Sequence, residues 1–183
     1  MNKDSHIIWL TGMSGSGKST LANLIKKYFE KKKCVVSIID GDFVRDNDEK
    51  QLGFGLNDVR INNMRIVSIC NKQRANFDLI IVPVISPYNK IREEIRKQLK
   101  PNFHLIYLKA DVDSLKDRDT KGLYAAADRG EINDLIGYSE VNPYDQPNNP
   151  ELIISTSNKV SVDESIDILI SYINKEIYNT PTN

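Results

Sequence analysis

The chain has 183 residues, of which 40% are hydrophobic and 27% are charged, and its 25 lysines and arginines balance 25 aspartates and glutamates. This length and composition are typical of one globular domain with a substantial core, and they exclude an extensively disordered chain. The net charge of zero excludes a global attraction to nucleic acids or to membranes, so any anion must be bound by a local site.

The first part of the chain predicts a strand, a helix and a second strand. The runs "HIIWLT" (6–11) and "CVVSIID" (34–40) are short and apolar, and between them apolar residues recur every three or four positions. That spacing places them on one face of a helix, whereas the short runs favour strands. The residues on the helix face are Leu21, Leu24, Ile25, Tyr28 and Phe29. The order predicts a βαβ opening.

Three further apolar runs predict three more strands. They are "FDLIIVPVIS" (77–86), "FHLIYLKA" (103–110) and "ELIIST" (151–156). The runs are nearly continuous rather than alternating, which is typical of strands that are buried on both faces of a parallel sheet. Together with the first two runs they make five strands.

Two later segments predict helices on the basis of spacing and capping. Ile91, Ile95 and Leu99 have helical spacing and follow a turn sequence, "SPYN". Ser161 and Glu164 form a capping box, which predicts the start of the last helix.

This order of elements predicts the fold class. Helices that alternate with buried strands indicate a three-layer α/β domain with right-handed crossovers, occupying residues 1–183 as a single domain. Ligands of such domains bind outside the carboxyl ends of the strands, so we expect the site in the strand-end loops. The polar tail, residues 178–183, is expected to be frayed.

The two cysteines and the amino-terminal sequence indicate a cytoplasmic location. Cys34 and Cys70 lie far apart in apolar surroundings without metal-ligand spacing, which predicts two small buried thiols in a reducing compartment. The apolar run "IIWL" near the start is too short for a signal peptide and far short of the ~20 residues that span a bilayer.

The segment "GMSGSGKST" (12–20) predicts a phosphate-binding loop. It matches the pattern G-x-x-x-x-G-K-[ST] and lies between a predicted strand and a predicted helix, which is the context that the motif requires. Its glycines let backbone N–H groups face phosphate oxygens, while Lys18 reaches the outer phosphates and Ser19 offers its hydroxyl to Mg²⁺. The pattern therefore predicts ATP and Mg²⁺. The donor-binding set is Gly12, Met13, Ser14, Gly15, Ser16, Gly17, Lys18, Ser19 and Thr20.

The residues after the second strand favour a kinase over a guanine-nucleotide switch. The segment "NKVS" (158–161) lacks the aspartate of N-K-x-D, and "DLIG" (134–137) stands too close to it to supply a switch strand. "IIDGDFVR" instead provides Asp40, Asp42 and Arg45. A carboxylate can accept the proton of an attacking hydroxyl, and an arginine can clamp an anionic acceptor.

Taken together, these motifs resemble the adenylylsulfate kinases, which use ATP to phosphorylate the 3′-hydroxyl of adenosine 5′-phosphosulfate in sulfate activation. Further blocks in the order of that family are "LGFG" (52–55), "RINNMR" (60–65), "ISPY" (85–88), "RDTKGLY" (118–124) and "NPYDQPNNPELII" (142–154). The resemblance implies a P-loop kinase fold with a five-stranded parallel sheet and a small nucleotide as acceptor. Because the family often forms dimers, it also implies a homodimer.

The resemblance implies roles for individual residues. Asp40 would be the general base, Lys18 would serve the transferred phosphoryl group, and Ser86 matches a serine once proposed to carry a phosphoryl intermediate. Direct in-line attack needs no such intermediate, and the alternative is that Ser86 shapes the turn before Pro87. Acceptor-binding roles are implied for Asp42, Arg45, Phe54, Arg60, Asn63, Ile85, Ser86, Lys121, Gly122 and Leu123.

Residues 118–147 resemble the family's lid, within which Arg118 would reach ATP. A lid is needed because water competes with the ribose hydroxyl for the phosphoryl group. By composition alone, "RDTKGLY" is equally well explained as a solvated charge run.

Several departures from the family keep other acceptors open. Gly55 replaces a serine, and Leu135, Ile136 and Gly137 stand where the family has Phe-Thr-Gly, which removes an aromatic residue that, with the equivalent of Phe54, sandwiches adenine. Losing one stacking face costs about 1–3 kcal/mol of base binding. One alternative is therefore a kinase that acts on another nucleotide-linked acceptor, such as cytidine diphosphoramidate. A non-catalytic ATP-binding regulator is a further alternative, which Asp40 argues against.

Overall fold

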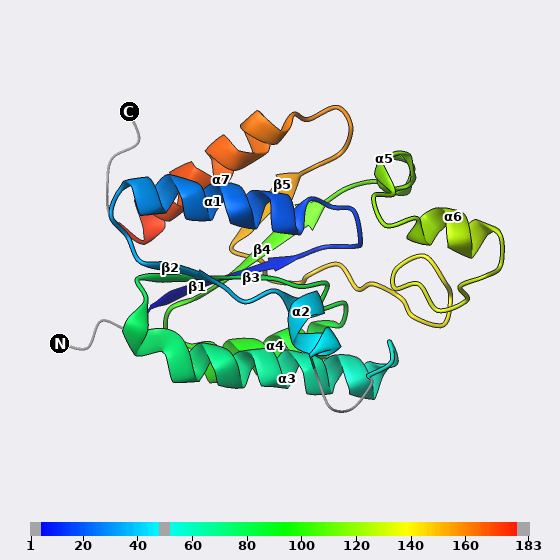
Figure 1. Ribbon diagram of the computed structural model, residues 1–183, viewed down its shortest axis with the longest axis horizontal. Coiled ribbons are helices and arrows are strands. Elements are labelled where there is room, and N and C mark those ends of the chain that lie inside the picture. The colour runs from blue at the N-terminus through cyan, green and yellow to red at the C-terminus, as the bar shows by residue number, and fades with distance from the viewer. Residues whose placement is uncertain (1–4, 48–51, 179–183) are drawn as a thin grey trace.

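A five-stranded parallel sheet forms the middle layer of the protein (Figure 1). The computed structural model describes residues 5–47 and 52–178. The sheet order is β2-β3-β1-β4-β5, and every pairing is parallel. The strands are β1 (His6–Thr11), β2 (Val36–Ile38), β3 (Leu79–Pro83), β4 (Phe103–Lys109) and β5 (Leu152–Ser155). The fold class predicted from the sequence is confirmed.

Burial on both faces explains why these strands read as continuous apolar runs. All residues of β3 are buried, as are five of the six residues of β1. In β1, Ile7 and Trp9 belong to one core cluster, whereas Ile8 and Leu10 belong to the other. Successive side chains of a strand point to opposite faces, so each face of the sheet has its own core.

Helices cover the two faces as separate layers (Figure 1). One layer contains α1 (Lys18–Lys31) and α7 (Val162–Glu176), which pack against each other, and α7 begins at the predicted capping box. The other contains α3 (Leu56–Gln73), α4 (Asn89–Leu99) and the short α2 (Gly41–Asp46). The remaining elements are the 3-10 turn η1 (Arg74–Asn76), α5 (Val112–Arg118) and α6 (Leu123–Asp128).

Four helices, α2, α3, α5 and α6, were not predicted from the sequence. The 18-residue α3 was missed because its buried face includes Asn62 and Asn63 beside apolar residues such as Val59 and Ile66, which interrupts the hydrophobic period. The other three helices have six or seven residues each, too few to establish a period.

The residues between β4 and β5 extend beyond the sheet, as Figure 1 shows. They include α5, α6 and the lid predicted from the sequence. We call residues 118–147 the lid segment. Leu115, Tyr124 and Leu135 form a small core there that is separate from the two cores of the sheet.

The described part of the chain bears on three further expectations. Cys34 and Cys70 are free thiols; Cys70 is buried as predicted, which raises its pKa to about 12, whereas Cys34 is only partly buried. Tyr178 stacks on Phe29 with ring centroids 5.4 Å apart, while the rest of the predicted frayed tail, 179–183, lies outside the described residues. Among the helices of residues 5–47 and 52–178, none combines the length and apolar character needed to cross a bilayer.

Candidate active site

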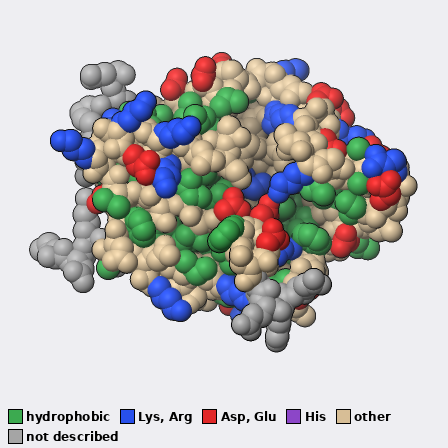
Figure 2. Space-filling model, in the orientation of Figure 1, with side chains coloured by type: hydrophobic (Ala, Val, Ile, Leu, Met, Phe, Trp, Pro, Cys, Tyr) green, Lys and Arg blue, Asp and Glu red, His purple; other side chains and the backbone are tan. Residues whose placement is uncertain are grey.

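A cavity of about 760 Å³ opens at the carboxyl edge of the sheet. The loops that follow β1, β2 and β3 form its floor, the lid segment forms one wall, and the start of α7 closes another side. Figure 2 shows acidic and basic side chains meeting in the middle of this face of the molecule. The position agrees with the strand-end location expected from the sequence.

The loop that follows β1 is shaped by its glycines. A Cβ atom at Gly12 would lie 2.6 Å from both the Leu108 carbonyl oxygen and the Ser16 hydroxyl, so no larger residue fits there. Gly17 has a φ of 89° and is the N-cap of α1, which has no side-chain cap and no acidic residue in its first turn. The positive end of the helix therefore faces the cavity without a competing carboxylate, as an anion site requires.

Lys18 is held inside this loop by the loop's own backbone. Its Nζ donates to the carbonyl oxygens of Gly12 and Met13, both at 2.8 Å, and lies 3.5 Å from the Ser16 hydroxyl. Burial lowers the pKa of Lys18 to about 8, against the opposing effect of Asp42. The ammonium group is thus poised where phosphate oxygens would replace the two carbonyls.

Ser19 and Asp40 lie together where a magnesium ion would be expected. The Ser19 hydroxyl donates to Oδ2 of Asp40 at 3.4 Å. Within the described ranges, no group of three or more histidine, cysteine or acidic side chains could hold a metal by itself. Mg²⁺ usually keeps several waters and adds substrate phosphates to one or two protein oxygens, so this pair fits that ion.

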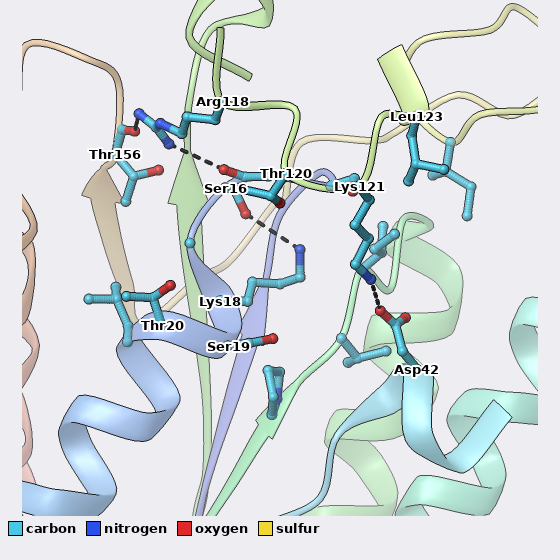
Figure 3. Close-up of a pocket in the computed structure, with 18 of the residues that line it drawn as sticks. Ser16, Lys18, Ser19, Thr20, Asp42, Arg118, Thr120, Lys121, Leu123 and Thr156 are labelled. Carbon is cyan, nitrogen blue, oxygen red and sulfur yellow. Dashed lines mark hydrogen bonds and ion pairs between the residues drawn. The ribbon is translucent and has the colours of Figure 1, made fainter. Parts of the chain in front are cut away.

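The two aspartates of the "DGD" segment have different surroundings. Oδ1 of Asp40 accepts the backbone N–H groups of Asp42 at 2.9 Å and Phe43 at 3.3 Å, so Asp40 caps α2. Asp42 points into the cavity and forms an ion pair of 2.5 Å with Lys121 of the lid segment (Figure 3). This pair raises the pKa of Lys121.

Arg45 and Phe54 form the outer part of the same side. The Arg45 guanidinium donates to the Gly53 carbonyl at 3.0 Å and lies 4.7 Å from the centroid of the Phe54 ring. Both residues line the cavity. A cation and an aromatic face are thereby presented together, as a nucleotide with an anionic tail would need.

The lid segment contributes aliphatic side chains to the cavity that Phe54 also lines. Leu135 and Ile136, the residues that depart from the family pattern, line the cavity together with Leu123 and Ile132. This end therefore offers one aromatic face and an aliphatic wall.

The opposite end of the cavity is organised by Arg118. Its guanidinium donates to the carbonyl oxygens of Gly15, at 3.2 Å, and Thr156, and to Oδ1 of Asn158 at 3.1 Å. Figure 3 shows Arg118 and Thr156 on one side of Lys18, with Lys121 and Asp42 on the other. The Thr156 hydroxyl is buried and has no hydrogen-bond partner among the residues that the structure describes.

Some lining residues were not predicted from the sequence. They include Thr120, Thr156, Asn158 and Val160. Thr156 directly follows β5, so its position at the end of a buried strand was a usable signal. The others come from loops whose path the sequence does not specify.

Several predicted site residues do not line the cavity. Arg60 forms an exposed ion pair with Glu94, and the buried Asn63 donates to the Val59 carbonyl at 2.8 Å. Ser86 is also buried, with its hydroxyl unpartnered within the described part of the chain. The full set outside the lining is Gly12, Met13, Arg60, Asn63, Ser86 and Gly122. The others predicted from the sequence are brought together around one space.

Comparison with known families and curated proteins gives consistent matches. The family model described as adenylylsulphate kinase matches residues 4–155. An adenylyl-sulfate kinase of Prochlorococcus marinus is 41% identical over 168 residues, which cover 91% of this chain and 82% of the relative. An adenylyl-sulfate kinase of Oceanobacillus iheyensis is 38% identical over 179 residues, which cover 97% of this chain and 88% of the relative.

Solved structures of kinases are similar to this chain as well. The APS kinase of Mycobacterium tuberculosis, in complex with AMPPNP and APS, superposes with a TM-score of 0.83 at 30% identity, covering 93% of this chain and 98% of that one. A gluconokinase from Sinorhizobium meliloti has a TM-score of 0.63 at 13% identity, a similarity of fold alone.

Proposed function

Because the chain belongs to the adenylylsulphate kinase family, we propose that it transfers the γ-phosphoryl group of ATP to the 3′-hydroxyl of adenosine 5′-phosphosulfate. The products are ADP and 3′-phosphoadenosine 5′-phosphosulfate. One observation supports this reaction above the others: the phosphate loop with Lys18 and the Asp42 carboxylate face the same cavity. The cavity can therefore hold a phosphoryl donor and a hydroxyl acceptor together.

The donor side binds ATP through the loop and Arg118. The phosphates take the place of the two carbonyls that hold Lys18. Ser19 and Asp40 would hold Mg²⁺, which supplies positive charge that neutralises the phosphate oxygens. Positioning and charge stabilisation are the main requirements of phosphoryl transfer.

The acceptor side holds the base against Phe54 and the anionic group against Arg45. Sequence reasoning assigned the general base to Asp40, but the contacts favour Asp42 for that role. Both carboxylate oxygens of Asp40 already accept hydrogen bonds, whereas the Asp42 carboxylate, which is exposed, pairs only with Lys121 among the residues that the structure describes. Asp40 then serves the metal.

The transfer follows from these positions. The oxygen of the 3′-hydroxyl attacks the γ-phosphorus while the hydroxyl proton passes to Asp42. The bond between the γ-phosphorus and the β–γ bridging oxygen breaks, which releases ADP. Lys18 and Lys121 stabilise the spreading negative charge. Ser86 is buried outside the cavity lining, so we propose direct transfer without a phosphoserine.

A panel of acceptors tests the function. Purified protein with Mg-ATP is supplied with adenosine 5′-phosphosulfate, cytidine diphosphoramidate or simple nucleoside monophosphates, and coupled ADP release is measured. We expect turnover with adenosine 5′-phosphosulfate. Faster turnover with the cytidine compound would support the alternative acceptor, whose base could stack on Phe54 alone. No ADP with any acceptor would indicate an ATP-binding regulator. Light scattering of the same sample tests the expected homodimer.

Replacing Arg45 with alanine should raise the KM for the acceptor about 10- to 100-fold, because a charge-assisted hydrogen bond contributes about 1.5–3 kcal/mol. The KM for ATP should stay unchanged. Arg129→Ala is the matched control, since Arg129 is exposed, pairs with Glu131 and does not line the cavity. An unchanged acceptor KM in Arg45→Ala would remove the clamp from the proposal.

The affinity for ATP should depend on pH through Lys18. Its pKa is lowered to about 8, so the ammonium group is charged below that pH and neutral above it. Phosphates bind the charged form, so affinity should fall up to about tenfold per pH unit above about pH 8, with proton uptake on binding. Calorimetry in buffers of different ionisation enthalpy measures both quantities. Affinity that is constant from pH 7 to pH 9 would contradict this reading.

A further inference from the structure

A buried hydrogen-bond network joins the end of the lid segment to the ends of β1 and β3. Tyr144 and Thr11 have their hydroxyl oxygens 2.9 Å apart, and the Thr11 hydroxyl donates to the Ile85 carbonyl. A hydroxyl has one proton, so Tyr144 is the donor to Thr11. Thr11 is the last residue of β1 and directly precedes Gly12, where the phosphate loop begins. Tyr144 thereby contacts the residue from which the phosphate loop begins, and we call Thr11 the root of that loop.

Arg92 of α4 ties the same lid residues to the turn after β3. It is 2% exposed, and its guanidinium donates to the carbonyl oxygens of Ser86 and Asp145, both at 2.6 Å, and to Oδ1 of Asn89 at 2.7 Å. Its guanidinium carbon lies 5.5 Å from the centroid of the Tyr144 ring. Among residues 5–47 and 52–178, Arg92 forms no direct ion pair, and the charge of the Asp145 carboxylate acts on it only from a greater distance.

A buried cation held by neutral oxygens is costly, so its position calls for an explanation beyond packing. Ser86 supplies one. Its φ of 45° is left-handed, a conformation that a non-glycine residue keeps only where its surroundings hold it. The carbonyls on either side of the Ile85–Ser86 bend are those bound by Thr11 and Arg92. Ile85 lines the same cavity as Asp42 and Arg45.

We propose that Arg92 and Tyr144 are positioning residues for phosphoryl transfer. They hold the lid segment, the Ile85–Ser86 bend and the root of the phosphate loop in one fixed relation, so that acceptor and donor are aligned. Neither residue lines the cavity, so each acts through the backbone it holds. The inference rests on the proposed function, because small misalignments have large effects on in-line transfer.

Tyr144→Phe tests the proposal because it removes only the hydroxyl bound to Thr11. The matched control is Tyr107→Phe, since the Tyr107 ring stacks on that of Tyr144 with centroids 6.0 Å apart, whereas its hydroxyl forms none of the hydrogen bonds described above for Tyr144, Thr11 and Arg92. We expect kcat in Tyr144→Phe to fall about tenfold, with both KM values within about twofold of wild type. The ratio of ADP to phosphorylated acceptor should rise above one, because misaligned acceptor lets water compete. The control should match wild type.

Arg92→Lys provides a second variant that keeps the charge but not the planar fork that reaches two carbonyls. Its loss of kcat should equal or exceed that of Tyr144→Phe, and the double variant should lose less than the product of the two single losses, because both act in one network. Strictly multiplicative losses, or a Tyr144→Phe enzyme identical to Tyr107→Phe, would overturn the proposal.

The activity of the wild-type enzyme shows whether a negative result concerns this inference or the proposed function. Wild type that transfers to no acceptor refutes the proposed function itself. Active wild type with an unaffected Tyr144→Phe variant refutes only the positioning role. Hydrogen exchange of residues 84–87 is measured alongside, and faster exchange is expected in Tyr144→Phe than in the Tyr107→Phe control. Equal exchange in the two would also count against the network.

Discussion

Asp42→Asn should lower kcat by a factor of about 10² to 10⁴, the range typical of removing a general base. The KM for ATP should remain within about twofold of the wild-type value, because the donor is held by the phosphate loop and Arg118. Steady-state kinetics with saturating Mg²⁺ measures both. The expected effect is large because Asp42 lines the cavity and is free of the capping bonds that Asp40 accepts, and Figure 3 shows it across from Lys18.

The control for this variant is Asp46→Asn. Asp46 lies one helical turn further along α2, is exposed and also borders the cavity. The Asp46→Asn substitution therefore removes the same charge from the same helix. We expect near wild-type kcat in that variant. Equal losses of kcat in Asp42→Asn and Asp46→Asn would mean that turnover depends on the total negative charge of α2 and not on a proton acceptor at Asp42.

Asp40→Asn distinguishes the two candidate bases. If Asp40 serves the metal and caps α2, this variant should need more Mg²⁺ for half-maximal activity and should lose about 1 kcal/mol of stability. Excess Mg²⁺ should then restore part of the turnover. A loss of 10² or more at saturating Mg²⁺, together with an active Asp42→Asn enzyme, would return the general-base role to Asp40.

Lys18→Met should lower kcat/KM for ATP by a factor of at least about 10² to 10³, since it removes a preorganised cation from the transferring phosphoryl group. The fold should persist, because Lys18 bonds only to carbonyls of its own loop and to Ser16 in the described structure. Lys26→Met on the same helix is the control. It removes a partly exposed lysine that pairs with Glu30 at 3.7 Å. Nucleotide titration and circular dichroism report binding and folding, and a Lys18→Met enzyme with normal kcat/KM would contradict the donor site.

The strands and the phosphate loop were predictable because their information is local. Burial on both faces makes β3 an unbroken apolar run, and the loop's glycine and lysine spacing is read directly from the chain. The 18-residue α3 was not predictable in the same way, since Asn62 and Asn63 occupy its buried face. A polar side chain on a buried face is decided by tertiary contacts, such as the bond from Asn62 to the Gly41 carbonyl.

The site was predictable as a list of residues more than as an arrangement. Lys121 and Asp42 are 79 residues apart, and nothing in either segment indicates that they pair. Arg60 was expected in the cavity by resemblance, yet Glu94 of α4 holds it on the surface. Partner choice of this kind depends on which helices become neighbours, here α3 and α4.

The separate core of Leu115, Tyr124 and Leu135 has a consequence for substitutions in the wall of the cavity. Leu123, Ile132 and Leu135 of this small core also line the cavity, whereas Lys18 and Ser19 belong to the helix that follows β1. Substitutions at these aliphatic positions are therefore expected to change the wall of the cavity while the two sheet cores stay as they are. Tyr124 is the exception, because its hydroxyl donates to the Ser14 carbonyl at 2.9 Å and so joins the small core to the phosphate loop.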